Sequence, residues 1–154
     1  MKHLFPLAFG FAIVSLLACE PVNNVDNGNC EISGLRLSAT INSQFWCASF
    51  FLTANLINNQ VVIEGASGAD FLTLRFLDYN VPGTYTTDAT FNTIQYSSSI
   101  MGNFESSDFS PGQLRITEHD AADNILKGTI DATLISGLGE NVLISGEFDV
   151  IYIE

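Results

Sequence analysis

The sequence is poor in basic residues, and this scarcity argues against one large class of partners. Only 5 of its 154 residues are lysine or arginine, against 17 aspartates and glutamates, so the formal net charge is -12. Nucleic-acid binding depends on clustered lysine and arginine side chains. Beyond Lys2, the bases of this chain stand far apart, at Arg36, Arg75, Arg115 and Lys127. We therefore expect no nucleic-acid partner, and we assign the acidic surface no role beyond solubility.

Residues suited to catalysis or metal binding are also scarce. Beyond residue 19, the chain has one histidine, His119, and two cysteines, Cys30 and Cys47. They lack the ligand spacing of a zinc site, and the Gly-x-Ser-x-Gly sequence of a nucleophile elbow is absent. We predict no catalytic residue, no metal and no cofactor, and we do not expect an enzyme.

Three acidic residues crowd one segment, at Glu118, Asp120 and Asp123. Their carboxylates could offer oxygen ligands to calcium, but the ordered alternation of a calcium-binding loop is absent. Aspartate and asparagine also stabilise tight turns by accepting hydrogen bonds from their own backbone. We therefore expect a turn here rather than a metal site.

No stretch of the domain shows the apolar stripe of an amphipathic helix, and β-branched residues and phenylalanine crowd the apolar runs. Apolar residues make up 47% of the chain and charged residues 14%, a balance typical of one globular domain. The predicted fold class is all-β. We expect a single antiparallel β-sandwich of about eight or nine short strands, with a partly open barrel as the alternative.

Alternation of apolar and polar residues predicts the strands in order. The first covers residues 35–41 and ends at a turn over 42–44. A further strand is expected over 45–57, where imperfect alternation indicates a bend or bulge. Others are expected over 61–66, 71–77, 84–87 and 91–100, followed by a long loop over 101–112. The last third of the chain predicts three antiparallel strands with turns at 119–124 and 136–140.

The aromatic residues divide into two groups. Trp46 shares its parity with Ala48, Phe50 and Leu52, so we expect the group Phe45-Trp46 and Phe50-Phe51 to lie mainly in the core, although exposed aromatics can also bind sugars or peptides. Other aromatics lie in or beside predicted loops and are the better candidates for surface contacts. These candidates are Tyr79, Phe104 and Phe109.

The N-terminus has the pattern of a secretory signal over residues 1–18. Lys2 precedes an apolar run over residues 4–17, and the small residue Ala18 ends it. A membrane-spanning helix needs about 20 apolar residues, and this run is shorter. Export from the cytoplasm is therefore the expectation.

Leu16 and Ala18, three and one positions before Cys19, resemble the lipobox of bacterial lipoproteins, although Leu17 stands where that pattern more often has a small residue. The resemblance implies cleavage between Ala18 and Cys19 and a diacylglycerol, with palmitate or a similar chain, on the Cys19 sulfur. The protein would then be anchored to a membrane of the bacterial cell envelope, inner or outer. We expect a flexible spacer over 19–30 and the β-domain over 31–154.

Cys30 and Cys47 remain as candidates for a disulfide in an oxidising compartment. A hairpin closed at residues 42–44 would place Cys47 near Ala39. Cys30 would then lie on the order of 30 Å away at about 3.3 Å per residue, whereas a disulfide needs Cα atoms within about 7 Å. Bonding therefore requires the chain to fold back, with Gly34 as the natural position.

From about Leu35 to its end, the chain resembles a family of small uncharacterised lipoproteins from Gram-negative bacteria. The resemblance implies an immunoglobulin-like sandwich and transfers no catalytic residue. Ser43 and Ile130 depart from the pattern, which has glycine and an aromatic there. The matching residues are Ala39-Thr40-Ile41-Asn42, Trp46, Pro82-Gly83-Thr84-Tyr85, Gly112, Leu114, Ile116-Thr117, Asp120, Gly128-Thr129, Gly146 and Phe148.

The leading hypothesis is a lipid-anchored, non-enzymatic binding or interaction module of the cell envelope, with a glycan or an envelope protein as ligand. One alternative is an envelope hydrolase or accessory enzyme that uses His119 and nearby carboxylates. A purely structural envelope protein is the other.

Overall fold

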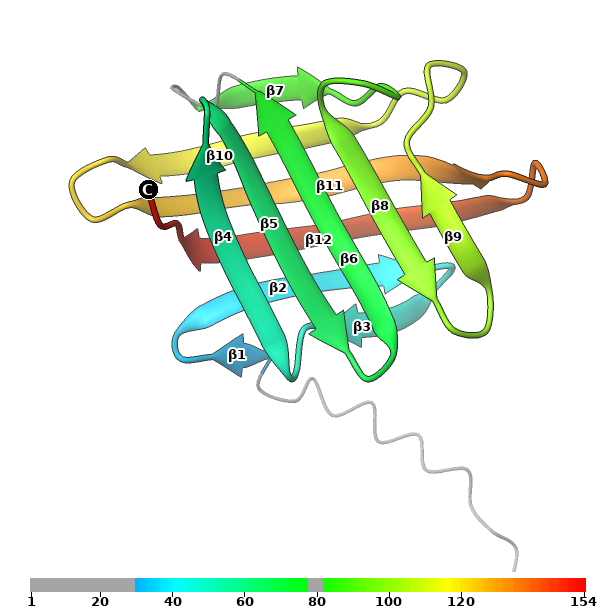
Figure 1. The fold of residues 1–154 in the computed structure, drawn as a ribbon, viewed down its shortest axis with the longest axis horizontal. Coiled ribbons are helices and arrows are strands. Elements are labelled where there is room, and N and C mark those ends of the chain that lie inside the picture. The colour runs from blue at the N-terminus through cyan, green and yellow to red at the C-terminus, as the bar shows by residue number, and fades with distance from the viewer. Residues whose placement is uncertain (1–29, 78–81) are drawn as a thin grey trace, which may run out of the picture.

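The computed structural model describes residues 30–77 and 82–154, and its regular elements are strands (Figure 1). This part of the chain holds no helix of the length and apolarity that crossing a bilayer requires. The strands are β1 (Glu31–Ile32), β2 (Leu35–Ile41), β3 (Gln44–Cys47), β4 (Phe51–Ile57), β5 (Gln60–Ser67), β6 (Asp70–Leu77), β7 (Gly83–Thr86), β8 (Thr93–Ser98), β9 (Gly102–Glu105), β10 (Gln113–Asp120), β11 (Ile125–Ser136) and β12 (Asn141–Ile151).

The strands form two packed layers. The front layer contains β4, β5, β6, β8 and β9 in that order, and the rear layer contains β2, β12, β11 and β10, with β1 and β3 beside β2 and β7 beside β10. The front strands cross the rear strands steeply (Figure 1). All the strand pairs that join these elements are antiparallel.

Hydrogen bonding continues from one layer to the other. The long strand β11 pairs with β10 along its first part, and near its end Ile135 and Ser136 pair with Glu105 and Phe104 of β9. At the other side, Ile153 follows β12 and bonds to the backbone of Ala54 and Leu56 in β4. The sheet is thus nearly closed and barrel-like with one seam, which confirms the predicted all-β antiparallel class.

The core lies between the layers and follows the predicted alternation. Leu72, Leu74 and Phe76 of β6 are fully buried, and so is Leu37 of β2. The rings of Phe76 and Phe148 pack with their centroids 6.2 Å apart, which joins the front and rear layers. Each such side chain contributes about 1.5–3 kcal/mol when it leaves water, so the hydrophobic core accounts for most of the stability of the fold.

Two tight hairpins explain why the first strands were predictable. Asn42-Ser43 joins β2 to β3, and Asn58-Asn59 joins β4 to β5, with positive φ at all four residues. This backbone geometry matches the twist of paired strands, and asparagine tolerates it well.

The single strand expected over 45–57 is wrong, because the chain leaves one layer and joins the other within it. β3 pairs with β2 in the rear layer, whereas β4 pairs with β5 in the front layer. Between them, the segment 48–50 crosses from layer to layer. The crossing resets the alternation, so that Trp46 is buried while Phe50 is 71% exposed. Phe45 and Phe51 are also exposed, so the expectation that this aromatic group lies mainly in the core is wrong except for Trp46.

The long loop expected over 101–112 is also wrong, since it contains β9. Asn103 and Glu105 of β9 point outward, whereas Phe104 is only 5% exposed and lies in the core. Ser106 follows Phe104 on the inner side, and its hydroxyl accepts a hydrogen bond from the Ile94 backbone and donates one to the carbonyl of Asp88. A strand of four residues with one apolar side chain gives too short a pattern to recognise.

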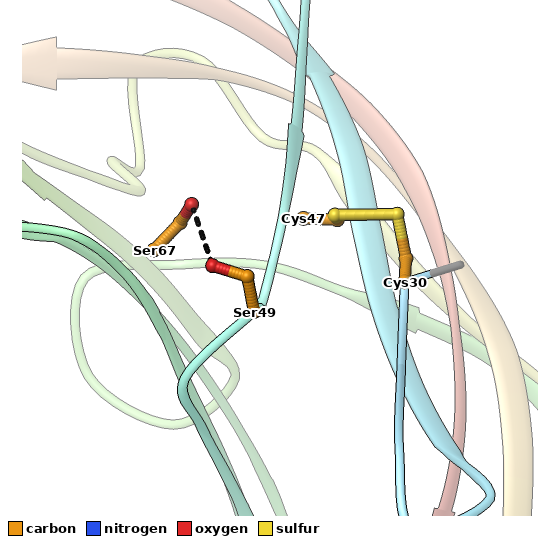
Figure 2. The surroundings of a disulfide bond; sticks show 4 residues. All are labelled: Cys30, Cys47, Ser49 and Ser67. Carbon is orange, nitrogen blue, oxygen red and sulfur yellow. Dashed lines mark hydrogen bonds between the residues drawn. A yellow bond between two sulfur atoms is a disulfide. The ribbon is translucent and has the colours of Figure 1, made fainter. Parts of the chain in front are cut away.

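The described chain begins at a disulfide between Cys30 and Cys47, which the expected separation of these residues argued against (Figure 2). Ser33 and Gly34 both have positive φ and reverse the chain, so that β1 lies antiparallel to β2. Cys47 lies opposite Ser38 of β2. The reversal brings the two cysteine Cα atoms to 5.7 Å, within the range that a disulfide requires.

Candidate functional site

The outer face of the front layer carries a hollow of about 350 Å³. It lies over β6, β8 and β9, and the end of β11 forms one wall. Ligand sites are usually concave, with a few polar groups placed among apolar ones. The side chains that line this hollow include Phe71, Gln95, Ser97, Asn103, Glu105 and Ile135.

Strand register brings these residues together. Side chains of directly paired residues share one face of a sheet. One row across the strands contains Thr73, Gln95, Glu105 and Ile135, and the neighbouring row contains Phe71, Ser97 and Asn103. The hollow therefore depends on β8 pairing with both β6 and β9.

The floor of the hollow is held by the core beneath it. Tyr96 and Phe104 point inward from β8 and β9 and are buried. The Tyr96 hydroxyl donates a 3.0 Å hydrogen bond to Asp70, whose other oxygen accepts one from the Ser99 backbone at 3.1 Å. Burial raises the pKa of Tyr96, and its bond to the Asp70 carboxylate adds to this effect, so the phenol stays protonated.

The exposed groups offer both apolar and hydrogen-bonding contact. The ring of Phe71 is about half exposed. Beside it, the Ser97 hydroxyl donates a 2.6 Å hydrogen bond to the Asn103 side-chain oxygen, and the Asn103 amide keeps N–H donors for another partner. Gln95 supplies a donor and an acceptor, and Glu105 supplies acceptors. This combination suits a neutral, polar ligand with an apolar face.

The described aromatics that were expected to form a binding surface have different environments. Phe104 is buried, which corrects its assignment as a surface residue. Phe109 is 95% exposed, but it is not among the residues that line the hollow. Tyr79 lies outside the described residues. The lining residue Phe71 was missed because it was considered only as part of a strand, although its outward parity was visible in the sequence.

The residues around His119 are engaged with their neighbours. His119 Nε2 lies 3.0 Å from the Tyr152 hydroxyl, and Glu118 pairs with Lys127 at 3.3 Å. Asp120 accepts hydrogen bonds from the backbone N–H groups of Ala122 and Asp123, as in a turn stabilised by aspartate. Within residues 30–77 and 82–154, no group of three or more histidine, cysteine, aspartate or glutamate side chains is placed to hold a metal ion.

Residues 35–150 match a family described as a domain of unknown function, DUF6252. The chain belongs to this family. An uncharacterised family was expected, and the match confirms that part of the expectation. No curated protein and no solved structure matches the chain.

The DUF6252 match runs from β2 nearly to the end of β12, and it includes the whole hollow. It leaves out Cys30 and β1. Several residues that carried the sequence resemblance have packing roles instead of places in the hollow. A side chain on Gly128 would collide with the Arg115 carbonyl and the Phe148 ring, and one on Gly146 would collide with β2. These glycines keep the rear strands in close contact.

Proposed function

We propose that this protein is a lipid-anchored, non-enzymatic binding module of the bacterial cell envelope, and that the hollow on the front layer binds a glycan. The anchor is the expected diacylglycerol on Cys19. The disulfide between Cys30 and Cys47 supports an exported protein, because disulfides persist in oxidising compartments such as the bacterial periplasm and the cell surface.

The hollow is the observation that supports a glycan as the ligand. A sugar ring has an apolar face, which can stack on an aromatic ring such as Phe71, and hydroxyl groups that need donors and acceptors at its edge. Gln95, Asn103 and Glu105 supply these groups within the same hollow. The described residues form no ion pair across this face, so its polar groups are available for a neutral ligand.

A glycan array with the mature protein tests the ligand class. We expect binding to be lost or reduced about tenfold or more when Gln95 and Asn103 are replaced together by alanine, since each lost hydrogen bond weakens binding by roughly 1 kcal/mol. Gln113→Ala on β10 is the matched control, because Gln113 is an exposed glutamine of the rear layer. Failure of every glycan to bind, or equal binding by all variants, would show that the hollow is not a glycan site.

The anchor is tested separately by metabolic labelling with palmitate. The label should enter the wild-type protein and be absent from a Cys19→Ala variant. Equal labelling of both proteins, or of neither, would contradict lipidation at Cys19 without bearing on the hollow.

A further inference from the structure

Several turns meet at the end of the barrel where the described chain begins (Figure 1). They are the crossing segment 48–50, the turn between β5 and β6, and the turn between β8 and β9. These three segments are called the anchor-end tip below. The disulfide ties Cys30 to Cys47, which directly precedes the crossing segment. The chain that leads to the proposed anchor at Cys19 therefore joins the domain beside this tip.

A series of contacts joins the disulfide to the tip. Two residues after Cys47, the Ser49 hydroxyl lies 3.3 Å from that of Ser67 at the end of β5 (Figure 2). Ser67 pairs with Asp70 across the turn, and Asp70 accepts the backbone hydrogen bond of Ser99. The three segments are therefore held together as one surface.

This surface is apolar and almost uncharged. Phe50 and Ile100 are 71% and 92% exposed, and Met101 is also exposed. Segments 48–50, 67–69 and 99–101 contain no charged residue. The nearby carboxylate of Asp70 is engaged by Tyr96 and Ser99. An exposed apolar cluster without charge is typical of a surface that contacts a partner or a lipid bilayer.

Two other loops with exposed aromatic residues have a different character. Phe91 and Phe109 are also exposed, but they stand in loops with Asp88 and Asp108. Carboxylates are expensive to bring into a bilayer interface. The apolar side chains of the tip have no such neighbours in their own segments.

We propose that the anchor-end tip inserts its exposed side chains, chiefly Phe50 and Ile100, into the lipid interface of the membrane that holds the anchor. This inference rests on the proposed lipidation of Cys19. Ten residues separate Cys19 from Cys30, and this chain can span at most about 40 Å. The bilayer is therefore within reach of the tip. A lipid anchor supplemented by inserted apolar side chains binds more firmly than the anchor alone. The hollow begins two residues from the β8–β9 turn, at Ser97 and Asn103, and extends away from the tip toward Glu105 and Ile135.

Depth-dependent fluorescence quenching tests the tip. The acylated full chain is reconstituted into phosphatidylethanolamine vesicles that contain brominated phosphatidylcholine, with Ile100→Trp and Leu138→Trp as a matched pair. Ile100 and Leu138 are 92% and 90% exposed, and both lie in hairpin turns. The emission of the parent protein, which comes from buried Trp46, is subtracted. We expect Ile100→Trp to lose most of its added emission and Leu138→Trp to keep its own.

Equal quenching of the two variants, or no quenching of Ile100→Trp, would overturn the inference. Vesicle flotation of the parent protein and of Cys19→Ala distinguishes a failure of the anchor from a failure of the tip contact. If the parent protein does not float, both the anchor and the tip contact are wrong. If it floats but Ile100→Trp is unquenched, the anchor stands and only the tip contact is wrong.

Discussion

The outer faces of the two layers differ in how they use their polar groups. On the rear layer, Arg36 pairs with Glu147 at 3.0 Å, and Lys127 lies 3.3 Å from Glu118 and 3.7 Å from Asp149. On the front layer, the charged residues Glu64, Arg75 and Glu105 form no ion pair with the described residues. The rear face pairs several of its charges with one another, whereas the front face leaves polar groups open beside a hollow.

The difference indicates which face is built for stability and which for contact. Exposed ion pairs contribute only about 0–1 kcal/mol each, but opposite charges on adjacent strands favour one register over others. Arg36, Glu147 and Asp149 belong to strands that are far apart in the sequence, β2 and β12. The front layer instead forms mainly from hairpins between strands close in sequence, and its register needs no such pairing.

Removal of the disulfide should have the largest effect on the free energy of unfolding. The loss of stability should be concentrated in the rear layer. Cys30→Ala/Cys47→Ala opens a link between residues separated by 17 positions, and the loss of this constraint on the unfolded chain is expected to cost about 3 kcal/mol. Urea unfolding measures the loss. Hydrogen exchange should show reduced protection in β1 and β3.

In the same double variant, exchange in β8 and β9 should change little, because these strands are held by pairing with β6 and β11. Equal loss of protection in both layers would contradict the view that they differ in how they are held together.

Alanine at glycine positions compares the packing of the two layers directly. In the rear layer, Gly128→Ala collides with the Arg115 carbonyl and the Phe148 ring, and a backbone atom cannot move aside easily. We expect a loss of about 3 kcal/mol. In the front layer, Gly65→Ala meets the tip of the Leu37 side chain at 2.8 Å, which can rotate aside, and the methyl of Ala48 at 2.9 Å, which can move only with its backbone. Its expected cost is about 1 kcal/mol.

Gly137→Ala is the control for both glycine variants, since a methyl group there meets nothing within 4 Å. Its unfolding midpoint should match that of the parent protein. If Gly65→Ala proves as damaging as Gly128→Ala, the two layers are equally intolerant of added volume, and close contact of strands is not a special feature of the rear layer.

The sequence was informative where a strand alternates over six or more residues and ends at a recognisable turn. Leu72, Leu74 and Phe76 followed this rule, and so did the hairpin at Asn58-Asn59. It was misleading where the chain changes layer or forms very short strands. Phe50 lost the parity of Trp46 at the crossing between layers, and the two-residue strand β1 that positions Cys30 has no visible period.

The hollow could not be predicted from the sequence for a related reason. Its residues Phe71, Gln95 and Asn103 are outward positions of three strands, and only the register between those strands makes them neighbours. Part of its wall, Ile135, comes from β11 through a pairing of only two residues with β9. Local patterns carry no information about such a contact, because it depends on how the whole sheet closes.

The smallest expected effect concerns the floor of the hollow and appears only at alkaline pH. Burial raises the pKa of Tyr96 above its ordinary value of 10.0, so the folded protein binds this proton more tightly than the unfolded chain does. The resulting stabilisation is complete below pH 10.0 and declines as the pH rises through the raised pKa. Tyr96→Phe removes the titrating group together with its hydrogen bond to Asp70. The difference in unfolding free energy between the parent protein and Tyr96→Phe should therefore be constant at neutral pH and shrink above pH 10.0, as measured by urea unfolding across the pH range. A difference that does not change with pH would mean that the phenol is no harder to ionise in the folded protein than in the unfolded chain, and that its burial beneath the hollow has no net effect on its pKa.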